Sequence, residues 1–193
     1  ELNGTELLGK PVHQRTRLGL GMSQQLVRPF RAMTVLENVM LAAGHGKTAS
    51  PLRALFNRNR DGERTRAMEL LDLVGIADAA NADPSALPLG FLKRLEVARA
   101  LALDPKILLL DEPLAGLNHA EANKLADTIT RLNQDGRTII LIEHNLSEVM
   151  RICSRLVVQD NGRKIGDGLP REVMADPVVR TAYLGGEDEN AAA

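Results

Sequence analysis

The segment Ile-Leu-Leu-Leu-Asp-Glu-Pro-Leu-Ala-Gly-Leu-Asn, residues 107–118, decides the fold that this sequence predicts. Its four consecutive large aliphatic residues are too few for a helix, and a proline follows soon after them. Such a run predicts a strand that is buried on both faces in a parallel sheet. Two carboxylates, Asp111 and Glu112, then stand at the carboxyl end of the strand, which is where ligands bind in an open α/β sheet.

Asp111 and Glu112 suit the hydrolysis of a nucleotide. The first carboxylate can hold Mg²⁺, directly or through water, because magnesium prefers hard oxygen ligands and comes with phosphate partners of its own. The second carboxylate can accept a proton from the attacking water. A strand that merely ends in a solvated acidic turn has the same pattern, so this segment alone leaves both interpretations open.

A second apolar strand is predicted from Thr138 to Ile142, and it too ends in polar residues, His144 among them. A strand, helix, strand unit of this length is a right-handed crossover, so the two strands are expected to be parallel. Asp111, Glu112 and His144 would then lie along the same edge of the sheet. A lone histidine is more often structural, but one at the end of a buried parallel strand beside two carboxylates is a candidate for contacting a phosphate.

Capping residues and hydrophobic periodicity predict the remaining elements. Thr34 with Glu37, and Asn118 with Glu121, have the spacing of capping boxes at helix N-termini. Helices are expected over residues 34–44, 66–74, 93–103, from 118, over 146–153, and from 170 to before 177. Extended segments are expected over residues 19–23, 155–159 and 163–166. The acidic tail after Gly186 is expected to be disordered.

Composition excludes several classes of partner. The net charge of −1, three Phe, one Tyr and no Trp give neither an electrostatic nor a stacking case for nucleic acid. Cys153 is the single cysteine, which excludes an intrachain disulfide and favours a cytosolic setting. No apolar run approaches the roughly 20 residues that span a bilayer, and no signal peptide is visible. We therefore expect no direct membrane span, and any membrane role must come through a partner.

The basic stretch from His45 to Arg66 favours a solvated surface over a phosphate or lipid-headgroup site. Within it, Gly46-Lys47-Thr48 looks like the end of a phosphate-binding P-loop. That loop needs a first glycine at position 41, which is Leu41, and a preceding strand where a helix is predicted. We interpret the tripeptide as a chance match.

Several motifs together resemble the ATP-binding subunit of ABC transporters, over nearly the whole chain. They are Leu-Leu-Leu-Asp-Glu-Pro followed by Ala-Gly-Leu-Asn, a glycine-then-helix segment about twenty residues upstream, and a histidine about thirty residues downstream. Residues 30–38, 94–101 and 182–185 further resemble the branched-chain amino acid importer ATPases. The resemblance implies an α/β fold with a P-loop NTPase, RecA-like ABC ATPase core, N-terminally truncated, and a helical subdomain.

The resemblance also implies roles for individual residues. Asp111 would be the Walker B magnesium carboxylate, Glu112 the general base and His144 the switch histidine that senses the γ-phosphate. Gln25 would be the Q-loop glutamine, which coordinates Mg²⁺ and water and reports to the transmembrane partner. Residues 114–118 would be the D-loop at a dimer interface, and residues 87–91 the signature loop that contacts the ATP of the other subunit. The nucleotide-contacting residues in these two loops would be Leu87, Gly90, Gly116 and Asn118.

At the level of the whole protein, the resemblance implies an ATPase that binds ATP and Mg²⁺ and powers import of branched-chain amino acids. Its partners would be transmembrane permease subunits and a second ATP-binding subunit, identical or not, in a two-fold sandwich. It would lie in the cytoplasm, peripherally at the inner face of the plasma membrane. The resemblance implies four parts. Residues 1–33 would be an N-terminal core remnant with the Q-loop, and residues 34–87 a helical subdomain. Residues 88–180 would be a RecA-like part with the signature, Walker B, D-loop and H-loop, and residues 181–193 a C-terminal element with the tail.

Two departures from the family pattern matter. The Walker A loop, expected a few dozen residues before Glu1, is absent from these residues, and the usual Leu-Ser-Gly-Gly-Gln signature is Leu-Pro-Leu-Gly-Phe at residues 87–91. We therefore expect this piece alone to bind ATP weakly and to hydrolyse it poorly or not at all. Loss of the Walker A strand is expected to leave the Ile107 strand with an unpaired edge.

Three alternatives to amino acid import stay open. One is a non-catalytic module that only docks to a membrane subunit, which the missing P-loop favours. Another is a lipid-exporting ATPase of the same subfamily. The third, an ABC-type ATPase that acts on DNA or ribosomes, is disfavoured because the chain has no long coiled-coil heptads and no second cassette.

Overall fold

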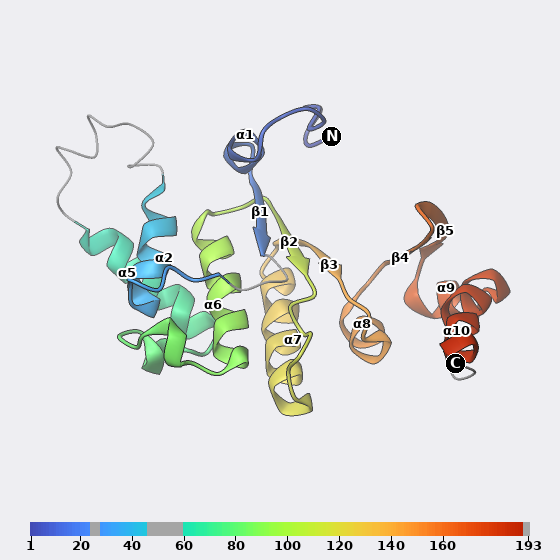
Figure 1. Ribbon diagram of the computed structural model, residues 1–193. Helices are drawn as coiled ribbons and strands as arrows, with labels where there is room; N and C mark the ends of the chain where they lie inside the picture. The colour runs from blue at the N-terminus through green and yellow to red at the C-terminus, as the bar shows by residue number, and fades with distance from the viewer. Residues whose placement is uncertain (24–27, 46–59, 191–193) are drawn as a thin grey trace. The chain divides into compact units, whose positions relative to one another are not determined.

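The computed structural model describes residues 1–23, 28–45 and 60–190 (Figure 1). The chain forms two compact units, Glu1–Glu143 and His144–Ala193. The Gly46-Lys47-Thr48 tripeptide and most of the basic stretch lie outside the described residues. Among those that are described, no helix combines the length and the apolar character needed to cross a bilayer.

The first unit contains a parallel three-stranded sheet in the order β1-β2-β3. Its strands are β1 (Leu20–Ser23), β2 (Ile107–Asp111) and β3 (Thr138–Ile142). The register pairs Ser23 with Leu110 and Asp111 with Ile142, so the predicted parallel crossover from β2 to β3 is confirmed. The expectation of an unpaired edge on the Ile107 strand is wrong, because β2 is the central strand and pairs with β1 on one side and β3 on the other.

Within the described part of the chain, one face of the sheet is covered more completely than the other. Leu108 and Leu110 are buried, whereas the alternate positions of β2 keep partial exposure. On β3, the side chains of Ile140 and Ile142 are 49% and 55% exposed. The strand that begins at Ile107 was expected to be buried on both faces, and among the described residues β2 does not meet that expectation, because only Leu108 and Leu110 are buried.

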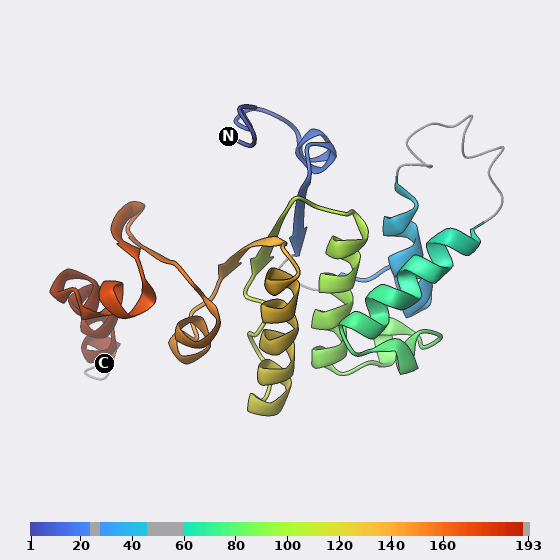
Figure 2. The ribbon, with the colours of Figure 1, turned by 180° about the vertical axis from the view of Figure 1, so that it is seen from behind.

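Helices flank the sheet in the first unit. They are α1 (Val12–Arg17), α2 (Val35–Ala43), α5 (Asp61–Leu73), α6 (Leu89–Ala102) and α7 (His119–Gln134), with single 3₁₀ turns at Ala77–Ala79 and Pro84–Ala86. Helix α6 packs on β1 and β2, with α7 on one side of it and α2 and α5 on the other (Figures 1 and 2). Helix α6, which begins within the predicted signature segment, therefore contacts both the sheet and three other helices of this unit.

The predicted helices of the first unit are present, although α5 and α6 begin earlier than predicted. Both capping boxes form: the Glu37 amide donates to Thr34 Oγ1 over 3.2 Å, and the Glu121 amide to Asn118 Oδ1 over 3.0 Å. The apolar faces of α5, α6 and α7 are buried, at Ala67, Leu70, Leu71, Leu95, Ala98, Leu101, Ala102, Ala122, Leu125, Ile129 and Leu132. Helix α5 begins at Asp61, earlier than the predicted Arg66, because its polar first turn carries no apolar stripe that periodicity could detect.

The second unit is a β-hairpin packed on short helices. Its elements are α8 (Leu146–Ile152), β4 (Leu156–Asp160), β5 (Arg163–Gly168), α9 (Pro170–Ala175) and α10 (Pro177–Asn190). A Cβ at Gly166 would lie 2.7 Å from Val173 Cγ1 and 3.0 Å from Val179 Cγ2, so glycine allows β5 to pack closely on both helices. Helix α10 continues to Asn190, beyond the position at which a disordered tail was expected.

Candidate functional site

Asp111 and Glu112 lie at the carboxyl end of β2, as predicted. Asp111 is the last residue of the strand, and both side chains are half-buried. Glu112 has a φ of +45°, in the left-handed region that residues other than glycine rarely adopt. Its amide donates to the carbonyl of Ile142 over 2.9 Å. The end of β3 therefore holds the backbone of the candidate general base in an uncommon conformation.

Lys93 of α6 lies beside this carboxylate pair. Its side chain is only 5% exposed, and its Nζ donates to the backbone carbonyl of Glu112 over 2.9 Å. Burial lowers the pKa of the Lys93 ammonium. Four negative charges oppose this effect, and from the largest contribution to the smallest they are Glu143, Glu112, Asp111 and Glu96. A buried cation thus sits among carboxylates at the ligand-binding edge of the sheet.

Glu143 follows β3 and connects it to the segment after β2. Its Oε1 accepts a hydrogen bond of 2.7 Å from the amide of Leu114. Sequence reasoning did not assign a role to Glu143 or to Lys93. A signal for Lys93 was available, because it occupies the buried helical stripe that continues at Val97, where a charged residue is unusual unless it has partners.

The predicted signature and D-loop segments lie against each other at the N-terminal ends of α6 and α7. A Cβ at the buried Gly90 would lie 2.8 Å from Glu121 Oε1, and one at Gly116, whose φ is +75°, would lie 2.9 Å from Leu89 Cδ2. Both glycines therefore permit a close approach. Asn118 is engaged by Glu121 in the capping box of α7. Leu87 is half-buried and immediately precedes Pro88, the N-cap of α6.

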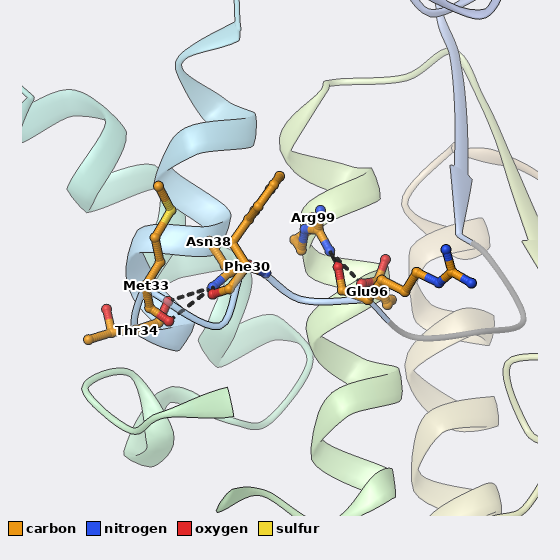
Figure 3. Close-up of polar contacts among 7 residues, drawn as sticks. Phe30, Met33, Thr34, Asn38, Glu96 and Arg99 are labelled. Atoms are coloured by element: carbon orange, nitrogen blue, oxygen red, sulfur yellow. Dashed lines mark hydrogen bonds and ion pairs between the residues drawn. The ribbon is translucent and has the colours of Figure 1, made fainter. Parts of the chain in front are cut away.

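Gln25 lies outside the described residues, but the segments that end at Ser23 and begin at Arg28 are described. Before it, Ser23 ends β1 with its side chain 3% exposed, and its Oγ has no hydrogen-bond partner in the described part of the chain. After it, the backbone from Phe30 to Thr34 is held by Asn38, which is 1% exposed (Figure 3). Asn38 Oδ1 accepts from the Phe30 amide over 2.8 Å, and its Nδ2 donates to the carbonyls of Phe30 and Thr34 over 3.1 and 2.9 Å.

Helix α6 also holds this segment, through Arg99. The guanidinium of Arg99 donates to the Arg28 carbonyl over 3.2 Å and lies 5.1 Å from the centre of the Phe30 ring (Figure 3). Glu96, one turn earlier, pairs with Arg99. Burial raises the pKa of the Glu96 carboxyl, and the charge of Arg99 acts against that rise. The same helix thus contacts the segment that follows Gln25 and, through Lys93, the end of β2.

His144 is the first residue of the second unit. Its side chain is exposed, and its backbone carbonyl accepts a hydrogen bond of 2.9 Å from the Tyr183 hydroxyl. The next residue, Asn145, caps α8 by accepting from the Glu148 amide. Tyr183 belongs to residues 182–185, which resemble the branched-chain importer ATPases, so this segment is hydrogen-bonded to the candidate switch histidine.

The donors at the strand ends fit a magnesium ion that arrives with a nucleotide. Nowhere in the described ranges do three His, Cys, Asp or Glu side chains gather as a metal cage would require. Magnesium retains waters and phosphate oxygens and needs only one or two carboxylates from the protein. Asp111 offers such a carboxylate, and the unpartnered Oγ of Ser23 is a further hard oxygen at the end of the neighbouring strand.

Comparison with known proteins gives two family matches. A family model described as "ABC transporter" matches residues 1–115, and one described as "Branched-chain amino acid ATP-binding cassette transporter" matches residues 163–189. The high-affinity branched-chain amino acid transport ATP-binding protein LivG of Salmonella typhimurium is 38% identical over 190 residues, which cover 95% of this chain and 74% of the relative. The lipopolysaccharide export system ATP-binding protein LptB of Haemophilus influenzae is 33% identical over 184 residues, with coverages of 95% and 73%.

Solved structures with the same fold are also ATP-binding cassettes. A nucleotide-free ATP-binding cassette from an ABC transporter has a TM-score of 0.77 and 26% identity, and the match covers 93% of this chain and 74% of that one. The ADP conformation of an ATP-binding cassette has a TM-score of 0.76 and 26% identity, with coverages of 94% and 74%. The ABC ATPase fold that the resemblance implied is therefore confirmed.

Proposed function

Because this chain belongs to the ATP-binding subunits of ABC transporters, we propose that it forms the site at which ATP is hydrolysed to power the import of branched-chain amino acids. One observation carries the catalytic part of the proposal. Asp111 and Glu112 end the central parallel strand, and the backbone of Glu112 is hydrogen-bonded both to β3 and to Lys93. A rigidly held carboxylate at this edge is well suited to act on a nucleotide.

The two carboxylates have separate roles in the proposed mechanism. Asp111, with Gln25, would hold the magnesium of Mg-ATP, and a bound magnesium would neutralise the charge that develops on the phosphates. Glu112 accepts the proton of the attacking water, which makes that water a better nucleophile. His144, directly after Glu143 in the sequence, contacts the γ-phosphate.

The signature and D-loop segments form the second half of the proposed site. Gly90 and Gly116 bring residues 87–91 and 114–118 together, with Leu87 and Asn118 at the helix starts. The N-terminus of α6 favours negative charge, because its first amides have no partners within the helix. We infer that this surface meets the ATP held by a second ATP-binding subunit in a two-fold dimer.

Amino acid import is preferred over lipid export on two observations. The C-terminal match to the branched-chain family covers residues 163–189, and the branched-chain relative is 38% identical against 33% for the lipopolysaccharide export relative. Transmembrane permease subunits are the proposed partners, and the proposed location is therefore the cytoplasmic face of the plasma membrane. The lipid-export alternative predicts ATPase stimulation by a lipopolysaccharide permease instead.

The test is Mg-ATP binding and hydrolysis by three proteins: this chain, the chain extended at its N-terminus by a relative's phosphate-binding segment, and the extended chain with Glu112→Gln. We expect hydrolysis by the extended chain and a loss of about 10²-fold or more in kcat with Glu112→Gln, because general-base catalysis contributes about 10²–10⁴-fold. ATP binding should survive that substitution. An extended chain that binds ATP without hydrolysing it would favour the non-catalytic docking module.

A further inference from the structure

Both backbone N–H groups of the turn from Glu112 to Leu114 donate a hydrogen bond. The Glu112 amide donates to Ile142, and the Leu114 amide donates to the carboxylate of Glu143 over 2.7 Å. Pro113, between them, has no amide hydrogen. The Glu112 carbonyl in turn accepts from Lys93 Nζ over 2.9 Å. Two charged side chains thus bind the peptide groups on the C-terminal side of the candidate base.

This arrangement explains why Glu112 keeps an unfavourable conformation. A non-glycine residue with a φ of +45° persists only where its surroundings determine the backbone more strongly than its own preference does. The bond from Lys93 fixes the carbonyl of Glu112, and the bond from Glu143 fixes the amide two residues on. The direction in which the Glu112 side chain leaves the backbone depends on that conformation.

The charges of the two residues support the same arrangement. An ammonium that is only 5% exposed would be costly without carboxylate partners, and Glu143 makes the largest favourable contribution to the charged form of Lys93. Lys93 comes from the helix that begins at the signature segment, whereas Glu143 directly precedes His144. The two residues therefore join α6, the end of β2 and the end of β3.

We propose that Lys93 and Glu143 are a pair of positioning residues that hold the Glu112 to Leu114 turn so that the Glu112 carboxylate is aimed for catalysis. The proposal rests on the proposed function of Glu112 as general base. Neither residue is expected to touch the nucleotide. Loss of either bond should therefore lower the rate of hydrolysis and leave the affinity for ATP unchanged.

The experiment uses two pairs of variants. Lys93→Met and Glu143→Leu replace the charged side chain with an apolar one of similar size and so remove the hydrogen bond. Lys93→Arg keeps a donor, and Glu143→Gln keeps an acceptor. Lys124→Met and Glu172→Gln alter exposed charges and serve as controls. Amide hydrogen exchange of residues 112–118 is measured in this chain without nucleotide. ATP affinity and kcat are measured in the chain extended by the phosphate-binding segment.

We expect faster exchange at Leu114 and a fall in kcat of about 10- to 100-fold in Lys93→Met and Glu143→Leu, since small misplacements of catalytic groups have effects of this size. ATP affinity should stay within about twofold, and the conservative variants should recover most of the rate. Unchanged exchange at residues 112–118, or a loss of ATP affinity that parallels the loss of kcat, would overturn the proposal. Full activity of Glu112→Gln would instead overturn the proposed function itself.

Discussion

The hydroxyl of Tyr183 donates a hydrogen bond of 2.9 Å to the backbone carbonyl of His144. The two residues lie 39 positions apart in the sequence, and both belong to the second unit. Tyr183 lies in α10, within the segment that matches the branched-chain family model. The family-specific C-terminal segment is thus attached to the residue that we propose to sense the γ-phosphate.

Removal of this hydroxyl should loosen α10 without unfolding the protein. We expect Tyr183→Phe to lower stability by about 1 kcal/mol or less, because a neutral hydrogen bond contributes about 0.5–1.5 kcal/mol and Tyr183 is 40% exposed. Amide exchange of residues 177–183 should become faster, and kcat of the extended chain should fall. Thr181→Val, which removes a hydroxyl bonded only within α10, is the control. Identical exchange in both variants would show that the contact with His144 does not hold the helix.

Asn38 should be a major determinant of stability in the segment that follows Gln25. Its side chain is buried and binds three backbone carbonyls and one backbone amide, at Phe30, Met33 and Thr34. We expect Asn38→Ala to cost about 2–3 kcal/mol, because the partly buried partners are left unsatisfied. Urea unfolding gives the value. Asn133→Ala removes an exposed side-chain bond to Arg137 and should cost less than about 1 kcal/mol; equal losses would contradict this reasoning.

Features encoded over a few neighbouring residues were predictable from the sequence. The caps at Thr34 and Asn118 and the bounds of β3 follow from spacing and apolar runs, and the structure has them as expected. Helix α5 was placed too late, because Asp61 to Thr65 carry no apolar stripe. Hydrophobic periodicity therefore detects the part of a helix that buries a face, and it misses a first turn that is stabilised by charge at the N-terminus.

The failures share a different physical cause, which is contact between residues far apart in the sequence. Strand order cannot be read from a single strand, so the Ile107 strand was wrongly given an unpaired edge. Lys93 and Glu143 acquire their roles only when α6, β2 and β3 meet, through bonds to Glu112 and Leu114. The position of Asp111 and Glu112 at the end of β2 was predicted correctly, because the strand and its acidic end lie in one segment.

Asn118 has a structural role in addition to the nucleotide contact that we propose for it. Its side chain accepts from the Glu121 amide, so Asn118→Ala should cost about 1 kcal/mol, equivalent to a fall of about 2–4 °C in Tm for a protein of this size. Asn118→Asp and Asn118→Ser keep a capping oxygen and should retain most of that stability. Thermal unfolding of the three variants separates the cap from any effect on ATP binding. A stable Asn118→Ala protein would show that the capping box contributes little.

The stability of the second unit should depend on acid pH through Asp167. Its carboxylate accepts from Arg155 Nε and Nη2 over 2.8 and 3.0 Å and from Lys164 Nζ over 2.9 Å. These bonds, that of Arg155 first, hold the pKa of Asp167 well below its ordinary value. A carboxyl group whose pKa is lowered by folding binds fewer protons in the folded state. Its stabilising effect is therefore complete above about pH 4 and is lost as the pH falls towards the folded pKa.

Asp167→Asn tests this dependence. The difference in unfolding midpoint between the natural chain and Asp167→Asn should be largest near pH 6 and shrink as the pH falls from about 4 to about 2. It should also shrink with added salt, because the ion pairs are exposed to solvent and salt screens them. Asp160→Asn removes a carboxylate at the end of the same hairpin, for which we expect a smaller change. A midpoint difference that stays constant across this pH range would mean that the hairpin does not depend on the ionised form of Asp167.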